Sequence, residues 1–536
     1  MSEKKTEILV AGASLGGVAA AYSALRLGKK VIMSEATDWP GGQLTAQLVP
    51  PDEHPWIEQV GSSVSWRELR RRVREYYRTH YPLRATPRAE HLLNPGLGAV
   101  GKICAEPRVF LSVIYDLFAP YLANGQLELM LRHVPIQAEL VGDRVCAITF
   151  ENNTNSKRIT VSAELIIDAT DFGDILELAK IEHVIGAESR AETDEMHALS
   201  GPADPMSQQA ITWCAAIDFR QGENHVGEKP ANYEYWRDYE PTPWEGPQFG
   251  WNFYHPVNKR TESMPLFAGP MSTRRAADWW HYRRLLYTEN FEPGYLDSDV
   301  TVINWPQNDY WHKPLLGVSI DAQQNALAAA REVTQALLYW LQTEAPNDTG
   351  ESGYPGLRLR PSISDTDDGF AKAPYVRESR RIRALQTLRE GDIGVEQRDH
   401  CGYAESVDNS IGVGYYRIDL HSTPSELMYV DVPCYPFQLP LGCLIPERVE
   451  NVLPGSKNLG VTHITNGTTR MHPTEWVIGE AAGALAAFSL SSGDSAQTIF
   501  ASRDKTSEFR ELLHQRIGID LEWPKYGSHD KLLIDW

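Results

Sequence analysis

A strand, a helix and a second strand are predicted within the first 35 residues, around a glycine-rich turn. Glu7 to Ala11 is a short apolar run that ends at a glycine cluster, which is typical of a fully buried strand in a parallel sheet. Val18 to Leu27 follows as an alanine-rich helix, and Gly28 stands at its end, where the backbone needs a positive φ. Lys30 to Ser34 is a second apolar run. The three segments together predict one β-α-β unit.

The turn inside this unit reads Gly12-Ala13-Ser14-Leu15-Gly16-Gly17, a variant of the dinucleotide-binding fingerprint. Gly12 permits the tight turn, the next residues bring the backbone close to a pyrophosphate at the helix N-terminus, and Gly17 allows close helix–strand packing. Ser14 replaces the usual second glycine, but its hydroxyl can still donate to a phosphate oxygen. Glu35 stands 23 residues after Gly12, where an acidic residue accepts hydrogen bonds from an adenosine ribose. The pattern predicts a bound dinucleotide.

The composition indicates a large folded protein. The chain has 536 residues, of which 42% are hydrophobic and 23% charged, so it has room for about three domain-sized units. Its formal net charge of −20 repels polyanions, and we therefore expect no nucleic-acid partner. The polar start, 1–7, and Glu480 within the most apolar late stretch, 476–490, argue against a signal peptide and a membrane span. We expect a cytoplasmic protein that does not bind membranes.

Metal-binding and disulfide patterns are missing from the sequence. Six cysteines are spread along the chain without a C-x-x-C pair, which fits neither a disulfide framework nor a zinc or iron–sulfur site. Asp419, His421, Tyr415 and Tyr416 form a polar and aromatic cluster that could line a pocket, but no third metal ligand stands at a convincing spacing. We expect no bound metal.

The character of the chain changes twice along its length. Ser65 and Glu68 form a capping-box pattern that opens a helix through Thr79. Strands are predicted at 127–134, 144–150 and 165–169. Residues 181–374 are rich in proline, glycine and aromatic residues and contain nine of the 15 tryptophans, with a helix predicted at 322–342. A strand at 449–453 and a helix at 474–490 then restore the βα pattern.

Four further segments carry a family resemblance. They are Trp39-Pro40-Gly41-Gly42-Gln43-Leu44-Thr45, Asp168 to Asp174, Pro374 to Arg381, and the stretch from Asn451 through Gly467-Thr468-Thr469-Arg470-Met471-His472-Pro473 to Gly483. In type and order these segments resemble the FAD-dependent oxidoreductases of the glutathione-reductase-like fold, in the branch called the FAD-dependent oxidoreductase family. The resemblance extends over nearly the whole chain.

The resemblance implies an α/β protein with a Rossmann-like FAD-binding domain built from both ends of the chain. Residues 1–180 and 375–495 form this domain, an α+β substrate domain is inserted at 181–374, and 496–536 is a C-terminal extension. The N-terminus of the last helix is suited to face the flavin pyrimidine ring. The implied cofactor-binding residues are Gly12, Ser14, Leu15, Gly16, Gly17, Glu35, Ala36, Gly42, Gln43, Leu44, Val134, Ala169, Thr170, Asp174, Thr474, Glu475 and Trp476.

Missing motifs narrow the chemistry. No redox-active cysteine pair follows the fingerprint, no second fingerprint would bind NAD(P)H, and the W-x-W-x-I-P motif of flavin halogenases is absent. The leading hypothesis is an oxidase or dehydrogenase that transfers a hydride from a small organic substrate to the flavin. Two alternatives stay open: an FAD monooxygenase that uses NAD(P)H and oxygen, and a non-catalytic flavin-binding electron carrier.

Candidates for the reacting site come from the end of the chain. Arg470 and His472 stand just before the last helix, and His463 lies a little upstream. A histidine near the flavin can take a proton as the hydride leaves the substrate carbon, although a lone histidine is more often structural. The tryptophans suggest a ring-bearing small-molecule substrate, because indole faces stack on flat ligands. A homo-oligomer is left open.

Overall fold

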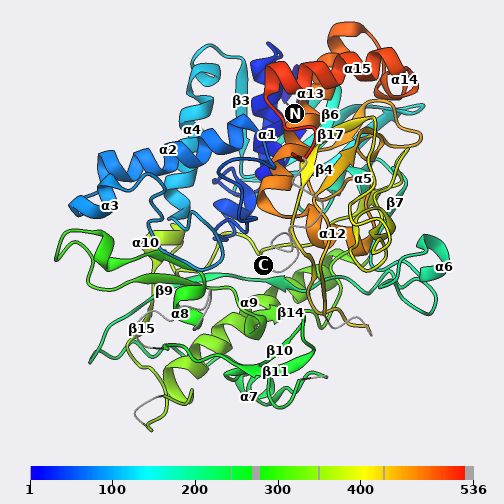
Figure 1. Cartoon of the computed structure of the whole chain (residues 1–536). Coiled ribbons are helices and arrows are strands. Elements are labelled where there is room, and N and C mark those ends of the chain that lie inside the picture. The colour runs from blue at the N-terminus through cyan, green and yellow to red at the C-terminus, as the bar shows by residue number, and fades with distance from the viewer. Residues whose placement is uncertain (1, 243, 269–277, 348–349, 426–428, 525–536) are drawn as a thin grey trace.

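The computed structural model describes residues 2–242, 244–268, 278–347, 350–425 and 429–524. Its largest sheet has seven strands in the order β3-β2-β1-β6-β5-β4, with β21 also paired to β6 (Figure 1). The strands are β1 (Ser2–Ala11), β2 (Val31–Glu35), β3 (Leu127–Leu131), β4 (His133–Val141), β5 (Arg144–Asn152), β6 (Arg158–Asp168) and β21 (Val452–Pro454). The pairs among β3, β2, β1, β6 and β21 are parallel, whereas β4, β5 and β6 form an antiparallel meander.

The predicted β-α-β unit is confirmed. Helix α1 (Leu15–Arg26) joins the parallel strands β1 and β2, in which Ile8 pairs with Val31. Gly28 follows the helix with a φ of +85°. The late strand is shorter and slightly later than predicted, and its Val452 pairs with Ile166 of β6. Strands from the beginning and the end of the chain therefore share one sheet.

Alternate side chains of β1 enter different hydrophobic clusters. Ile8 and Val10 belong to the large cluster that contains α1, α4 (Pro107–Ala123) and α13 (His472–Ser492). Leu9 and Ala11 belong to a second cluster with residues of β5, β6 and α5 (Asp174–Leu178). This alternation follows from the period of two in a strand, and it makes β1 a central strand buried on both faces.

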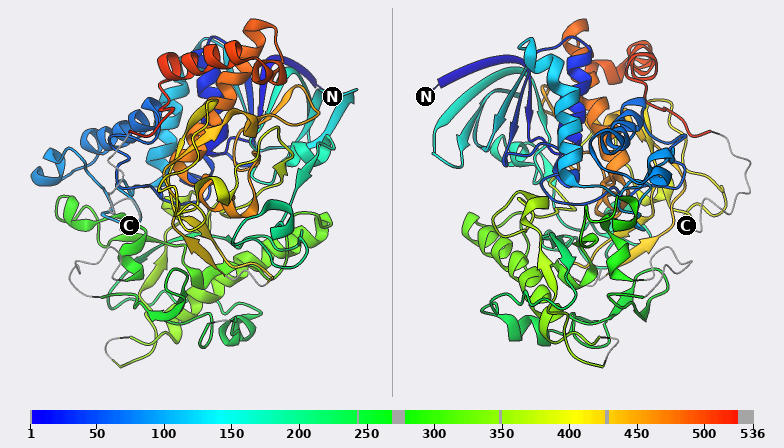
Figure 2. Two further views of the ribbon diagram at one scale, coloured as in Figure 1. Left: turned by 45° about the vertical axis from the view of Figure 1, so that its right-hand side comes forward. Right: turned by 90° about the vertical axis from the view of Figure 1, so that its left-hand side faces the viewer.

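Glycines allow α1 and α13 to pack in close contact. A Cβ atom at Gly479 would lie 2.0 Å from the carbonyl oxygen of Gly16, and one at Gly483 would lie 2.1 Å from that of Ala20. Figure 2 shows the two helices side by side next to the main sheet. The helix that begins near the fingerprint and the late helix are thus held together without intervening side chains.

The capping box predicted for the second helix is wrong by two residues. Helix α2 (Val64–His80) has Ser63 as its N-cap, and the Ser63 hydroxyl accepts from the Trp66 backbone N–H. Ser65 lies inside the helix, where its hydroxyl bonds to the Glu480 carboxylate. Local sequence alone could not separate two nearby serines, because the choice depends on the contact with α13.

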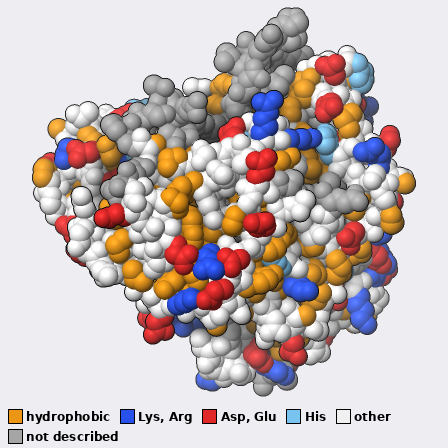
Figure 3. Space-filling model, turned by 90° about the horizontal axis from the view of Figure 1, so that it is seen from below, with side chains coloured by type: hydrophobic (Ala, Val, Ile, Leu, Met, Phe, Trp, Pro, Cys, Tyr) orange, Lys and Arg blue, Asp and Glu red, His pale blue; other side chains and the backbone are white. Residues whose placement is uncertain are grey.

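The middle of the chain forms the lower part of the molecule in Figure 1. Its antiparallel sheet has the order β12-β13-β9-β15, from β9 (Ala215–Phe219), β12 (Arg284–Leu286), β13 (Val300–Ile303) and β15 (Leu357–Leu359). The predicted helix is confirmed as α9 (Ile320–Thr343). Buried tryptophans on α7 (Tyr233–Asp238), α8 (Trp279–Tyr282) and α9 pack in one hydrophobic cluster with this part of the chain. The face seen from below carries acidic and basic side chains interspersed (Figure 3).

Shorter elements complete the described fold. The helices are α3 (Ala85–Ala89), α6 (Arg190–Thr193), α7 (Tyr233–Asp238), α8 (Trp279–Tyr282), α10 (Pro361–Ser364), α11 (Glu390–Ile393), α12 (His463–Thr469), α14 (Ala496–Ala501) and α15 (Arg503–Leu512). The strands are β7 (His183–Val184), β8 (Ile211–Thr212), β10 (Asn252–His255), β11 (Arg260–Ser263), β14 (Asp309–Tyr310), β16 (Arg381–Ile382), β17 (Ser410–Gly414), β18 (Ile418–Leu420), β19 (Val430–Val432) and β20 (Phe437–Pro440). Among the described residues, no helix has the length and apolar character needed to cross a membrane.

Parts of the expected C-terminal extension and of the expected inserted domain lie outside the described residues. The expected C-terminal extension, 496–536, contains α14 and α15 and is described through residue 524. Ile519 forms a β-bridge with Ser63, so the extension packs back onto the start of α2. Residues 243, 269–277 and 348–349 of the expected insert also lie outside the described residues.

Candidate active site

The fingerprint turn brings the backbone of two strands close together at the start of α1. Gly12 has a φ of +89°, and a Cβ atom there would lie 2.5 Å from the carbonyl oxygen of Ala169. Ser14 is the N-cap of α1, and its Oγ accepts from the Gly17 N–H at 3.2 Å. The Ser14 hydroxyl hydrogen is not used by that bond, so this side chain can still donate to an anion at the helix N-terminus.

Glu35 holds the loops on both sides of the fingerprint. One carboxylate oxygen accepts from the Ala13 N–H at 3.1 Å, and the other accepts from the Thr37 N–H at 2.8 Å. Burial raises the pKa of Glu35 to about 7. The carbonyl of Ala36 accepts from the Asn153 side chain at 2.6 Å. Val134 lies on β4, close after Arg132, whose N–H donates to the Thr37 carbonyl at 2.8 Å.

Glu475 connects the fingerprint to the Gly-Gly segment. Its Oε1 accepts from the Gly16 N–H at 3.2 Å and from the Ser456 hydroxyl at 2.7 Å. Its Oε2 accepts from the Gln43 side chain at 2.5 Å. Gln43 lies in the short 3₁₀ turn Gly42–Leu44, which packs on α1 because a Cβ atom at Gly42 would lie 2.9 Å from the Leu15 nitrogen. Three distant segments therefore meet at the start of α1.

The turn after β6 reaches the same place. The Ala169 N–H donates to the Ala11 carbonyl at 2.8 Å, and the Thr170 hydroxyl donates to Asp168 Oδ1 at 2.8 Å. Asp168 Oδ2 accepts from two N–H groups of α5, so Asp168 is a capping residue. Burial raises the pKa of Asp174, the first residue of α5, to about 6.

Trp476 is the exception among the expected cofactor-binding residues. Its Nε1 donates to the Ser65 hydroxyl at 2.7 Å, and its ring centroid lies 5.7 Å from that of Trp66. These contacts place the side chain in the interface between α13 and α2, whereas Glu475 points to the fingerprint. Thr474 lies in the first turn of α13, beside Gly414.

Three residues at this place are not among the expected cofactor-binding residues. Lys457 is buried and donates to Asp171 at 2.8 Å, and Gln47 donates to the other oxygen of that carboxylate at 2.8 Å. Burial alone would lower the pKa of Lys457, but the charges of Asp171 and Glu475 hold it above its ordinary value. These residues come together only through the tertiary fold.

The residues at the start of α1 fit an FAD molecule. In the described part of the chain, Gln43 Oε1 and Gln47 Oε1 are buried and have no hydrogen-bond partner. Unpartnered buried acceptors are costly, and FAD carries donors that would satisfy them, namely the ribityl hydroxyls and the flavin N3–H. The close backbone approach at Gly12 and the helix N-terminus at Ser14 suit the pyrophosphate.

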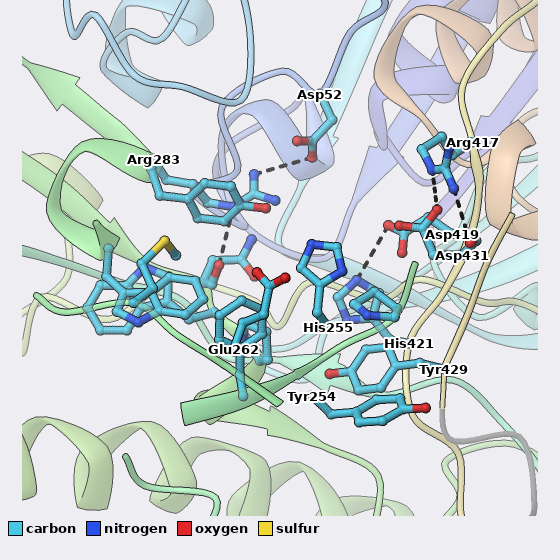
Figure 4. A pocket seen from close by; sticks show the side chains of 18 of the residues that line it. Asp52, Tyr254, His255, Glu262, Arg283, Arg417, Asp419, His421, Tyr429 and Asp431 are labelled. Carbon is cyan, nitrogen blue, oxygen red and sulfur yellow. Dashed lines mark hydrogen bonds and ion pairs between the residues drawn. The ribbon is translucent and has the colours of Figure 1, made fainter. Parts of the chain in front are cut away.

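A cavity of about 600 Å³ lies beside this group of residues (Figure 4). Its volume is within the range of about 300–1,000 Å³ typical of small-molecule sites. Asp52 lines one end, and its backbone N–H donates to His472 Nδ1 at 3.1 Å, which joins the cavity to the start of α13. Further lining comes from the β10–β11 hairpin, α8, and the segments 375–377, 416–421 and 429–431. Of the four residues expected to line a pocket, Asp419, His421 and Tyr416 belong to this lining. Tyr415 does not belong to the described lining, and its ring lies against Trp56 and Trp523 instead.

His421 forms a dyad with Asp309 in this cavity. His421 Nδ1 lies 2.5 Å from Asp309 Oδ2, and its Nε2 lies 3.6 Å from Asp419 Oδ2. Burial alone would raise the pKa of Asp309, but the charges of Arg377 and His421 outweigh it and hold the pKa below its ordinary value. Asp309 is therefore an ionised carboxylate that fixes the ring through Nδ1. Among the described residues, no group of three or more His, Cys, Asp and Glu side chains is arranged to hold a metal ion.

Arg470 lines the same cavity. Its guanidinium donates to the Tyr375 hydroxyl at 2.7 Å and to the Asp419 carbonyl at 2.8 Å, and it lies 3.1 Å from Asp419 Oδ2. Arg470 is also the C-cap of α12. Its side chain therefore forms part of the wall of this cavity.

The two other expected catalytic residues have different surroundings. His472 Nδ1 accepts from the Asp52 N–H, and its Nε2 lies 3.3 Å from the Val49 carbonyl, so the backbone engages both ring nitrogens. Burial lowers the pKa of His472 to about 3. His463 Nδ1 lies 3.0 Å from the Glu378 carboxylate, and neither histidine belongs to the described lining of the cavity. The geometry does not bring these two rings to the place where Arg470 and His421 meet.

Comparison with known proteins gives a family match over nearly the whole chain. The family model described as FAD dependent oxidoreductase matches residues 7–513. No curated protein matches the chain.

Three solved structures are similar to the chain at low identity. A geranylgeranyl bacteriochlorophyll reductase-like protein of Thermoplasma acidophilum is 10% identical with a TM-score of 0.33, over 96% of this chain and 85% of that one. The FrdA chain of E. coli quinol fumarate reductase is 11% identical with a TM-score of 0.31, over 96% and 74%. The L-proline dehydrogenase of P. horikoshii is 11% identical with a TM-score of 0.19. The match covers 36% of this chain and spans only 26% of the length of that dehydrogenase. Likeness at this level says nothing about the substrate.

Proposed function

The chain belongs to the FAD dependent oxidoreductase family, and from that membership we propose that it is an oxidase or dehydrogenase that transfers a hydride from a small, ring-bearing organic molecule to FAD. The observation that carries this proposal is the Asp309–His421 dyad in a cavity that Arg470 also lines. The enzyme is an FAD-dependent oxidoreductase by its family; the direction of transfer and the kind of substrate are the proposal.

We assign the FAD-binding domain to residues 1–180 and 375–495, in a glutathione-reductase-like arrangement, with the substrate domain at 181–374. The shared sheet supports this division, since β1 and β21 both pair with β6. The hydrophobic cluster that contains the buried tryptophans of α7, α8 and α9 supports it too, because nearly all its members lie between Ile211 and Val376. The cavity is then formed where the two domains meet.

The residues at the start of α1 would hold FAD. Ser14 and the neighbouring backbone bind the pyrophosphate, Glu35 accepts from the ribose, and Gln43 and Gln47 accept from the ribityl or flavin part. Bound there, FAD supplies the acceptor for the substrate hydride. The N-terminus of α13 and the charge of Lys457 place positive potential at the same end of the site.

His421 is assigned the role of general base in place of His472. Asp309 engages Nδ1, so Nε2 is the nitrogen left to take a proton from a substrate hydroxyl or amine. A proton on Nε2 would have Asp419 Oδ2 3.6 Å away, which stabilises the resulting imidazolium. His472 is a poor base at neutral pH because burial lowers its pKa to about 3.

Two alternatives are distinguished by the source of electrons. A monooxygenase needs a site for NAD(P)H, and an electron carrier needs no substrate cavity. In the described residues, the sheets other than the main one consist of antiparallel pairs, which are unlike the parallel βαβ unit that binds a nicotinamide dinucleotide. This observation favours hydride transfer from the substrate itself.

Anaerobic mixing of the purified holoenzyme tests the proposal. A panel of alcohols, amines and hydroxy acids is mixed with the protein in a stopped-flow instrument, and NADPH and NADH are mixed in parallel. Bleaching of the flavin band by one substrate class, and not by either nicotinamide, is the expected result. Bleaching by NADPH alone would indicate the monooxygenase, and bleaching by none would indicate the carrier.

A further inference from the structure

The charges that line the cavity are arranged in pairs. In the part of the lining that the structure describes, each of the four arginines lies beside a carboxylate. The pairs are Arg283–Asp52 at 3.2 Å, Arg377–Asp309 at 3.2 Å, Arg470–Asp419 at 3.1 Å and Arg417–Asp431. An anionic substrate group would have to compete with these carboxylates for the guanidinium groups. The lining therefore does not favour a carboxylate or phosphate substrate.

The acidic side chains of the cavity do not favour a cationic substrate either. Asp52, Asp419 and Asp431 each have an arginine partner. Glu262, on the exposed β10–β11 hairpin, accepts from the Asn258 amide. An amine that enters the cavity would lie near guanidinium groups as well as carboxylates. Its positive charge would therefore add little to the binding free energy.

Paired charges on the wall suit a ligand with hydroxyl groups. Each hydroxyl can both donate and accept, so it bonds to a guanidinium N–H and to a carboxylate oxygen without disturbing the pair. Hydrogen bonds to charged partners are stronger than those between neutral groups. Asp419 and Asp431 face each other across β18 and β19, which places two such pairs side by side on one wall.

Aromatic rings form another part of the wall. Phe253 and Tyr254 come from β10, Tyr282 from α8, and Tyr416 and Tyr429 from the loops around β18 and β19. All five side chains are half-buried. Figure 4 shows Tyr254 and Tyr429 below His421 at one end of the cavity. Aromatic rings of this kind pack against the C–H faces of a saturated ring, while charged groups bond to its edge.

We propose that the cavity takes a neutral carbohydrate, a pyranose or its glycoside, which is oxidised at a hydroxyl-bearing carbon. This inference rests on the proposed function and names its substrate class. The carbon gives a hydride to FAD, the hydroxyl proton goes to Nε2 of His421, and the product is the corresponding carbonyl compound. Atoms and electrons balance, because the two electrons of the broken C–H bond leave with the hydride and reduce the flavin.

The first experiment compares substrates that differ in charge. The holoenzyme is mixed anaerobically with the methyl glycosides of glucose, galactose and mannose, with glucuronate and galacturonate, with glucosamine, and with benzyl alcohol. We expect at least one neutral pyranoside to bleach the flavin, with a rate constant divided by Kd about tenfold or more above that of its uronate. A preference for a uronate, an amino sugar or the aromatic alcohol would overturn the inference.

The second experiment alters one ion pair. Asp431→Asn removes the carboxylate beside Arg417, so a carboxylate on the substrate gains a free partner. We expect the ratio of uronate to neutral-pyranoside efficiency to rise about tenfold or more. Asp365→Asn is the matched control, because Asp365 pairs with Arg108 on the surface, away from the cavity. An unchanged ratio in Asp431→Asn would contradict the role of paired charges.

The third experiment uses a side chain from the aromatic wall. Tyr254→Leu should raise the Kd of the neutral pyranoside about tenfold or more, with the same FAD content. Tyr403→Leu is the control, because Tyr403 is 64% exposed and outside the cavity lining. An equal Kd in the two variants would contradict the proposed packing.

The outcomes separate this inference from the proposed function. If an acid or an amine is preferred to every neutral pyranoside as the reductant of the flavin, hydride transfer from the substrate stands and the carbohydrate inference fails. If a neutral pyranoside perturbs the flavin spectrum without reducing it, the ligand class stands and the oxidase or dehydrogenase proposal fails. If none of the compounds binds or reduces, the carbohydrate inference is contradicted.

Discussion

The Nδ1 atom of His421 lies 2.5 Å from Oδ2 of Asp309, although 112 positions separate the two residues in the chain. Asp309 begins β14 in the middle of the chain, and its other oxygen accepts from the Thr212 hydroxyl at 2.5 Å. His421 follows β18, in the part that carries the late βα segments. The bond therefore connects the proposed substrate domain to the proposed FAD-binding domain, at the cavity.

Asp309→Asn tests whether this bond sets the orientation of the ring. An asparagine keeps the shape but loses the charge that fixes the Nδ1 proton, so the wrong nitrogen can face the substrate. We expect flavin reduction to slow by about 10²-fold or more with FAD still bound. Stopped-flow rates from pH 5 to 9 measure the effect, with Asp365→Asn as the control for a paired surface aspartate. A parent-like rate and pH profile would contradict the role of Asp309.

His472→Gln should leave flavin reduction close to the parent rate, because the ring is held by backbone groups on both sides. Its effect should appear in stability. Burial lowers the pKa of His472 to about 3, so the unfolded chain binds a proton below pH 6.5 that the folded protein excludes. The stability that this group contributes is complete above pH 6.5 and is lost as the pH falls toward 3, at about 1.4 kcal/mol per pH unit.

Denaturant midpoints at pH 7 and pH 5 measure this contribution. The parent should lose more stability between the two pH values than His472→Gln does. Equal losses, together with a reduction rate lowered about 10²-fold or more, would return the base role to His472.

Glu35→Ala should weaken FAD binding. The change removes the acceptor of the Ala13 and Thr37 N–H groups and the expected ribose contact, at a cost of about 1–3 kcal/mol in binding free energy. Titration of the apoprotein with FAD gives the Kd. Glu128→Ala is the control, since Glu128 lies on β3 and pairs with Lys4 at the surface. Equal FAD affinity in the two variants would mean that Glu35 does not contribute to the site.

Gly17→Ala tests the close packing at the fingerprint. A Cβ atom at Gly17 would lie 2.1 Å from the carbonyl oxygen of Gly12, so the start of α1 must move away from β1. We expect a loss of about 1–3 kcal/mol in stability and less bound FAD per chain. Gly201→Ala introduces the same methyl group where no atom lies within 4 Å and serves as the control. Normal FAD content and thermal stability in Gly17→Ala would contradict this reading of the turn.

The parts of the fold that could be predicted depend on local patterns. The run before Gly12, the alanine-rich helix and Gly28 are determined by neighbouring residues, and the β-α-β unit was therefore found in the right place. The sequence predicts the wrong N-cap for α2 because two serines stand two positions apart and the contact with α13 decides between them. The same limit applies to every residue whose partner is distant.

The site illustrates that limit most clearly. Hydrogen bonds join Gly16, Gln43 and Glu475, three of the residues expected to bind FAD, at the start of α1, whereas Trp476 faces the interface with α2. The cavity combines Asp52, Arg283 and His421 from three segments with no shared motif, and His421 contacts the buried Asp309 from a fourth. The position of His472 beside the start of α13 predicts a role in proton transfer, but its side chain turns toward the backbone of 49–52.

The most direct test of the account is anaerobic flavin reduction in His421→Gln. The parent and the variant, with equal FAD content, are mixed with the best reducing substrate across pH 5 to 9. Loss of the general base predicts reduction slower by about 10²- to 10⁴-fold at neutral pH, with a smaller difference at high pH, where hydroxide replaces the base. Reduction of His421→Gln at the parent rate, with the same pH dependence, would contradict the assignment of this cavity as the place where the substrate gives up its proton and hydride.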